Sequence, residues 1–157
     1  MAGPYAAPFR IALVVSRYHE FITDNLEAGA RAALKEAGLR DEDVVTHKVP
    51  GAYELAQAAH RVAQTGSCEA IICLGCLIKG ETPHFDYIAG AAAQGIMRAA
   101  QTTGVPIAFG VLTTNTAEEA IARAGDGPAN KGRESAMAAL DMARLYRSLP
   151  ARAGDPL

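Results

Sequence analysis

A stretch in the middle of the chain holds the residue types that chemistry on a phosphorylated molecule requires. An apolar run that begins at Ala70 is followed by residues 80–82 (Gly-Glu-Thr) and then by His84. The apolar run predicts a buried parallel strand, and residues 86–103 predict a helix. The polar residues therefore lie where the carboxyl end of a strand meets the amino end of a helix.

This junction predicts an anion site with a proton-transfer group beside it. Open α/β sheets bind ligands at the carboxyl ends of their strands. The free backbone N–H groups and the dipole at a helix start favour a negative charge there. The imidazole of His84 is the side chain best suited to proton transfer near neutral pH. Together they indicate chemistry on a phosphorylated small molecule.

The other predicted strand ends carry further candidates, each with two interpretations. Tyr18 either stacks on a planar ring or covers the core. Glu54 either accepts hydrogen bonds from sugar-like hydroxyls or stabilises the start of its own helix, and the backbone of Gly51 and Ala52 could read the polar edge of a ring. Arg123 either pairs with a phosphate or is a solvated cation at a helix end.

The cysteines and the remaining histidines indicate neither a metal site nor a redox site. Cys73 and Cys76 form a C-x-x-C pair, but residues three apart in a strand face opposite sides, and no second Cys/His pair completes a zinc site. We interpret them as buried strand residues, and His19, His47 and His60 as structural. We expect chemistry without a metal or a cofactor.

Composition narrows the class of protein. The chain has 157 residues, half of them apolar, and we expect one domain over residues 1–157. A net charge of -2 without a cluster of Lys or Arg argues against nucleic acid as a partner. The apolar runs are too short to span a bilayer, no signal peptide is recognisable, and three cysteines fit a reducing compartment. These observations predict a cytoplasmic protein.

The pattern along the chain alternates strands with helices. Strands are predicted at residues 10–16, 44–49, from 70 onward and at 106–113, with helices after each of them. This order predicts a single-domain, three-layer α/β/α fold with a four-stranded parallel sheet in the flavodoxin-like order 2-1-3-4.

Local signals place the helix ends and the two termini. Thr23 is predicted to cap the first helix, and Leu145 to face inward with Ala136, Ala139, Leu140 and Ala143 on the last helix. Residues 1–9 form an arm that is either mobile or pairs with the sheet edge of a neighbouring subunit. Residues 150–157 are predicted to be a frayed tail.

Four motifs now make the sequence specific. They are PGAYEL (50–55), GETPHFDY (80–87), FGVLTTNT (109–116) and NKG (130–132). In order and spacing they resemble the 6,7-dimethyl-8-ribityllumazine synthases, over about residues 10–149. The resemblance implies condensation of 5-amino-6-(D-ribitylamino)uracil with 3,4-dihydroxy-2-butanone 4-phosphate, releasing phosphate and water, in the penultimate step of riboflavin biosynthesis.

Three alternative functions compete with this one. The first is a non-catalytic oligomer that binds riboflavin or a lumazine, and the second is a purely structural shell. The third is a flavodoxin-like electron carrier, which would need a phosphate loop after the first strand.

The resemblance also implies a role for individual residues. His84 is the expected proton-transfer residue, and Tyr18 stacks on the pyrimidine ring. In the family the site lies between subunits, so that some residues serve the pocket of the neighbour. The residues expected to contact the pyrimidine and the ribityl chain are Ala52, Tyr53, Glu54, Cys76, Leu77, Ile78, Phe109 and Lys131. Those expected to contact the phosphate are Gly80, Glu81, Thr82 and Arg123. Of these residues, Phe109, Arg123 and Lys131 are expected to come from the neighbouring subunit.

Two departures from the family pattern bear on the flavin affinity and on the assembly. Tyr18 stands where the family more often has Phe or Trp. The loop 125–130 contains Pro128, whereas members that form sixty-subunit shells usually lack a proline there. A fixed φ in this loop would misdirect the last helix for contacts between pentamers. We therefore expect a homo-oligomer and favour a pentamer over a decamer or an icosahedral shell.

Overall fold

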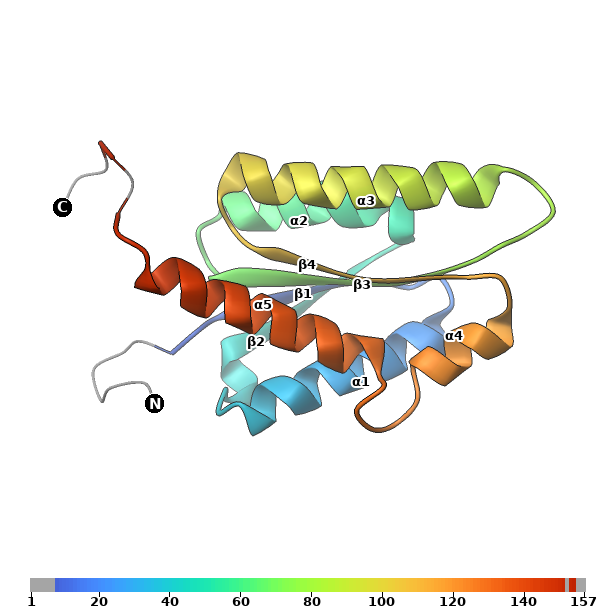
Figure 1. The fold of residues 1–157 in the computed structure, drawn as a ribbon, viewed down its shortest axis with the longest axis horizontal. Coiled ribbons are helices and arrows are strands. Elements are labelled where there is room, and N and C mark those ends of the chain that lie inside the picture. Colours follow the sequence, from blue (N-terminus) through green and yellow to red (C-terminus); the bar gives the residue numbers. More distant parts are fainter. Residues whose placement is uncertain (1–7, 152, 155–157) are drawn as a thin grey trace.

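The computed structural model describes residues 8–151, 153 and 154, which form three layers (Figure 1). A parallel sheet lies in the middle, with helices on both faces. The elements are β1 (Ile11–Ser16), α1 (Glu20–Glu36), β2 (Val44–Val49), α2 (Leu55–Gln64), β3 (Ala70–Ile78), α3 (His84–Thr103), β4 (Ile107–Thr114), α4 (Ala117–Arg123) and α5 (Lys131–Ser148), with short 3-10 helices at Asp41–Asp43 and Ala52–Glu54.

The sheet has the order β2-β1-β3-β4, and all its pairings are parallel. Helices α2 and α3 cover one face, and α1, α4 and α5 cover the other (Figure 1). This arrangement confirms the predicted fold class and strand order. Because all strands run the same way, the loops that follow β1, β2 and β3 meet at one edge of the sheet.

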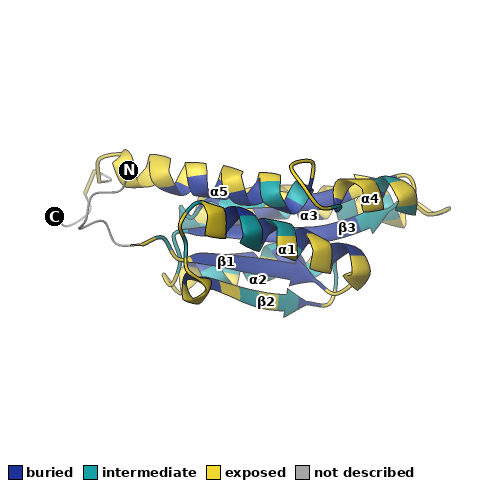
Figure 2. Cartoon of the chain, turned by 90° about the horizontal axis from the view of Figure 1, so that it is seen from below, coloured by how far each residue is buried: buried dark blue, intermediate teal, exposed yellow. Residues whose placement is uncertain are grey.

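The core consists of two apolar clusters, one on each face of the sheet. Strand β1 and the first seven residues of β3 are buried on both faces, as Figure 2 shows by their dark colour. Cys76 belongs to the cluster under α1 and α5, and Cys73 to the cluster under α2 and α3. The two thiols therefore point to opposite faces, which confirms the interpretation of the C-x-x-C pair as strand residues.

Helix α1 begins earlier than predicted. Its first residue is Glu20, after His19 in the left-handed conformation (φ 59°, ψ 50°), and the side chain of His19 makes no capping bond. The prediction that Thr23 caps this helix is therefore wrong. Thr23 is buried one turn further on, with its hydroxyl donating to the Glu20 carbonyl at 3.5 Å.

Helix α5 buries the predicted stripe except at its end. Ala136, Ala139, Leu140 and Ala143 are buried, but Leu145 is 47% exposed. The prediction for Leu145 is wrong because a residue two positions after Ala143 is turned by about 200° from it on a helix of 3.6 residues per turn.

The predicted arm and tail lie mostly outside the described residues, since residues 1–7, 152 and 155–157 are not described. At the edge of the described part, the Arg147 guanidinium stacks on the Phe9 ring, 3.7 Å from its centroid. None of the helices in residues 8–151 is both long enough and apolar enough to cross a membrane.

Candidate active site

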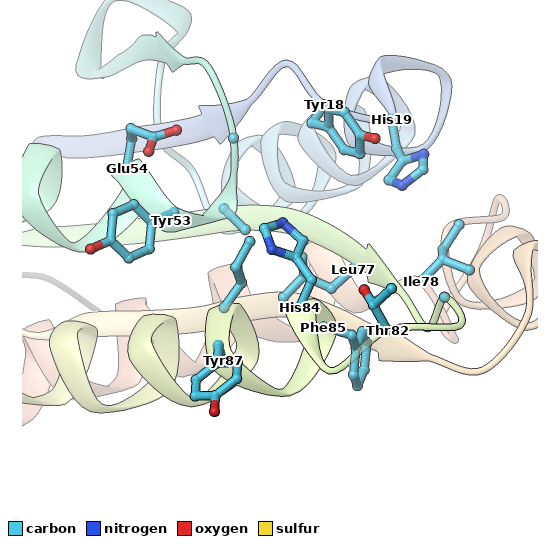
Figure 3. A pocket seen from close by; sticks show the side chains of 14 residues that line it. Tyr18, His19, Tyr53, Glu54, Leu77, Ile78, Thr82, His84, Phe85 and Tyr87 are labelled. Atoms are coloured by element: carbon cyan, nitrogen blue, oxygen red, sulfur yellow. The ribbon is translucent and has the colours of Figure 1, made fainter.

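A cleft of about 830 Å³ opens where the loops after β1, β2 and β3 meet (Figure 3). His84 lies in the middle of this view, with Tyr53 and Glu54 on one side and Tyr18 and His19 on the other. We call it the first cleft. It is lined by Tyr18, His19, Gly51, Ala52, Tyr53, Glu54, Leu77, Ile78, Gly80, Thr82, His84, Phe85, Tyr87 and Ile88.

Close packing of α3 on α2 brings these loops together. A Cβ atom on Gly95 of α3 would lie only 2.7 Å from the Cβ atom of Ala56 on α2, so a larger residue there would push the helices apart. Gly75 of β3 similarly leaves room for Leu55, whose Cδ1 atom would be 3.0 Å from an added Cβ. The start of α3, which carries His84, is therefore held near the turn that follows β2.

The turn before α3 is open to solvent, as an anion site requires. Gly80, Glu81, Thr82 and His84 are all exposed, and His84 is the first residue of α3. The first N–H groups of a helix have no partner within it, and the helix dipole adds positive potential at this end. Gly80, Thr82 and His84 therefore line the first cleft together, and the anion site itself stays a prediction.

Tyr18 presents an aromatic ring at the rim of the cleft. It is 65% exposed, which argues against the alternative that it covers the core. Its ring contacts the His19 ring edge to face, with centroids 4.6 Å apart, and His19 makes a similar contact with Phe21 at 6.3 Å. Partial burial lowers the pKa of His19 from its ordinary value, because burial disfavours the imidazolium.

A second cleft of about 590 Å³ lies at the β4 edge of the sheet. It brings together Phe109, Arg123 and Lys131, the three residues expected to serve a neighbouring subunit. The full lining is Phe109, Val111, Leu112, Thr113, Thr114, Glu119, Arg123, Ala129, Lys131 and Glu134. The two clefts share no lining residue.

The two cations of the second cleft differ in their partners. Arg123 is exposed at the end of α4, and its guanidinium donates to the Glu119 carbonyl at 3.0 Å. Lys131, at the start of α5, pairs with Glu134 at 3.1 Å. Within the described residues, Arg123 forms no ion pair with a carboxylate, so its charge is available to an anion.

Two predicted site residues line neither cleft, and several lining residues were not predicted. The Cys76 side chain is buried in the core, and Glu81 is exposed outside both linings. His19 lines the first cleft although it was expected to be structural. Its signal in the sequence is only its place directly after Tyr18 at a strand end. The other lining residues that were not predicted are Phe85, Tyr87, Ile88, Val111, Leu112, Glu119, Ala129 and Glu134.

Comparison with known proteins identifies the family to which the chain belongs. The family model of 6,7-dimethyl-8-ribityllumazine synthase matches residues 8–147. The 6,7-dimethyl-8-ribityllumazine synthases of Chlorobium phaeovibrioides and Salinibacter ruber are 49% and 47% identical to the chain over 140 residues, which is 89% of this chain and 90% of each relative. That of Desulfatibacillum aliphaticivorans is 45% identical over 136 residues, or 87% of this chain and 88% of the relative. The chain therefore belongs to the 6,7-dimethyl-8-ribityllumazine synthase family.

Proposed function

We propose that the protein condenses 5-amino-6-(D-ribitylamino)uracil with 3,4-dihydroxy-2-butanone 4-phosphate to form 6,7-dimethyl-8-ribityllumazine. The observation that carries the proposal is the first cleft. It places an aromatic ring, a carboxylate, the amino end of a helix and an imidazole around one space. The protein would act in the cytoplasm, where its three unpaired cysteines stay reduced.

In this proposal the first cleft holds the aminouracil and the chemistry. The Tyr18 ring stacks on the pyrimidine, and the Glu54 carboxylate accepts hydrogen bonds from the ribityl hydroxyls. The backbone of Ala52, Tyr53, Leu77 and Ile78 contacts the ring, and Cys76 adds a backbone contact although its side chain is buried.

The phosphate of the second substrate occupies the turn before α3. Gly80 and Thr82 line the cleft there, and Glu81 contributes through its backbone N–H group. The N–H groups and the helix dipole offset part of the phosphate charge. The rest of the phosphate charge requires a cationic side chain, and the lining of the first cleft contains no Lys or Arg.

We infer that a neighbouring subunit supplies this cation. Phe109, Arg123 and Lys131 lie together on the second cleft, which shares no residue with the first. A head-to-tail interface joins two different surfaces, and repeated around a closed ring it would place the second cleft of each subunit against the first cleft of the next. The lumazine synthase family forms homo-oligomers, and a closed ring of subunits is one such assembly.

The reaction makes modest demands on the protein. The 5-amino group attacks the ketone, and water leaves as the Schiff base forms. The carbon that bears the 3-hydroxyl then loses its proton as the phosphate departs with its electron pair, and the resulting enol becomes a new carbonyl group. The ribitylamino nitrogen attacks this carbonyl and closes the ring with loss of a second water. Each of these steps moves a proton, and in this proposal His84, which lines the first cleft, carries it. Holding the two substrates together supplies much of the rate.

Mixing two impaired variants tests both the activity and the shared site. With the phosphorylated ketone below the wild-type KM, we expect oligomers of Arg123→Ala alone and of His84→Ala alone to make little fluorescent lumazine from the two substrates. Coexpression in equal amounts should restore activity to about a quarter of the wild-type value, because about a quarter of head-to-tail interfaces then combine two intact halves.

The outcomes separate the possible functions. No recovery in mixed oligomers, with both variants folded, would contradict a site shared between subunits. A wild-type protein that binds the lumazine but forms none from the two substrates would instead favour the non-catalytic binding oligomer.

We propose a pentamer as the assembled state. Pro128 occupies the second position of a turn that the Asn130 N–H closes on the Gly127 carbonyl at 3.2 Å. This turn directs the start of α5, and a fixed φ within it restricts the ways in which α5 can meet another pentamer. Sedimentation should show a particle of five subunits, and a particle near a megadalton would contradict the proposal.

A further inference from the structure

Asn130 is a buried amide that joins three segments of the chain. Its Nδ2 atom donates to the carbonyl of Asn25 on α1 at 3.2 Å and to the carbonyl of Gly125 at 3.0 Å. Its Oδ1 atom accepts from the Arg133 N–H in the first turn of α5 at 3.1 Å. Both donors and the acceptor are therefore used, and the amide can face only one way, because its nitrogen meets two carbonyls.

Two glycines allow close packing around this amide. A Cβ atom on Gly29 of α1 would overlap the Asn130 side chain, and a Cβ atom on Gly132 would overlap the carbonyl of Leu26 on α1. Helices α1 and α5 therefore lie in close contact beside Asn130. The contact anchors the start of α5 to a helix that also packs on the sheet.

The residues beside this anchor are the cations of the second cleft. Lys131 follows Asn130 directly, and Gly125 lies two residues after Arg123. The bond to the Gly125 carbonyl thus ties the end of α4 to the start of α5, and the bond to Asn25 ties both to α1. The Asn130 backbone N–H also donates to the Gly127 carbonyl and closes the turn there. Asn130, the last residue of loop 124–130, therefore bonds to this loop at both Gly125 and Gly127.

We propose that Asn130 is a positioning residue, which fixes the placement of Arg123 and Lys131 relative to each other and to the sheet. The inference rests on the proposed role of Arg123 in binding the phosphate. Asn130 lines neither cleft. Its effect reaches the phosphate through the loop. A residue that served only to cap α5 would need the Oδ1 contact but not the two Nδ2 contacts.

The experiment removes the two donors and keeps the cap. Asn130→Ser retains an oxygen that can accept from the Arg133 N–H but cannot reach both carbonyls. Asn130→Asp retains the acceptor and places a carboxylate against the carbonyls of Asn25 and Gly125. In each variant we expect the Ki of inorganic phosphate and the KM of the phosphorylated ketone to rise about tenfold, while the KM of the aminouracil stays within about twofold.

The matched control is Asp43→Ala. Asp43 is also buried and accepts a backbone N–H, that of Arg40 at 3.0 Å, but it precedes β2 at the opposite end of the sheet. This variant should lose thermal stability without any change in the phosphate Ki. The same substrates and phosphate are measured with Arg123→Ala as the reference for loss of the cation.

The measurements on these variants decide between a positioning role and a purely structural role for Asn130. If Asn130→Ser is destabilised like the control but binds phosphate as tightly as the wild type, while Arg123→Ala binds it weakly, Asn130 is only a structural cap and the inference fails. If Arg123→Ala itself leaves phosphate binding unchanged, the proposed function of the second cleft fails. Should Asn130→Asp not assemble because of its buried charge, Asn130→Ser decides the question.

Discussion

Replacing Arg123 with Ala should raise the KM for 3,4-dihydroxy-2-butanone 4-phosphate by about 10-fold to 100-fold. A hydrogen bond to a charged group contributes about 1.5–3 kcal/mol, which corresponds to this range. The guanidinium is exposed and bonded only to the Glu119 carbonyl, so binding an anion breaks no ion pair within the described chain. Steady-state rates measured against each substrate in turn give the change.

The specificity of the effect distinguishes a phosphate clamp from a general loss of charge. The KM for the aminouracil should change little, and Arg123→Lys should recover only part of the affinity, because an ammonium cannot form the paired contacts of a guanidinium. Arg61→Ala removes an exposed arginine from α2 and serves as the control. Unchanged KM and kcat in Arg123→Ala would show that the assignment of Arg123 is wrong.

Replacing His84 with Ala should lower kcat by about 100-fold without abolishing turnover, as loss of a general acid or base commonly does. Residual activity is expected because the site still holds two substrates together, and because phosphate is already a fair leaving group. The KM values should change less than kcat, since His84 moves protons rather than anchoring either molecule.

Single-turnover and steady-state assays on the same preparation measure this change, with His60→Ala as the control. His60 lies on α2 and lines neither cleft. A kcat for His84→Ala within twofold of wild type would remove His84 from the mechanism and leave the cleft as a positioning device.

The fold could be predicted because its strands and helices carry strong, separate patterns. Strand β1 and the first seven residues of β3 are buried and form continuous apolar runs in the sequence. Gly38 and Gly104 end their helices in the left-handed conformation, as expected of glycine. The start of α1 could not be predicted, because His19 precedes it without a capping side chain and Thr23 offered a better cap inside the helix.

The first cleft followed from one rule, that ligand residues gather at the carboxyl ends of parallel strands. That rule found Tyr18, Glu54 and His84, because each follows a recognisable strand. It could not find Tyr87 or Ile88, which lie a turn into α3, where only the packing of helices decides which side chains face the cleft. Arg123 was a candidate phosphate partner from its own position at a helix end. Phe109, Lys131 and the grouping of all three at a subunit boundary came from the family resemblance, since no local pattern relates these residues to one another.

The burial of Cys73 and Cys76, and the partial burial of Cys68, have a practical consequence for work on this protein. Burial raises the pKa of Cys73 to about 12 and that of Cys68 and Cys76 to about 11, so that at neutral pH hardly any of the reactive thiolate exists. Maleimides and other sulfhydryl reagents should therefore leave the native chain almost unlabelled. A single cysteine introduced on an exposed loop could then be labelled selectively with a fluorophore, without replacing the three natural cysteines first.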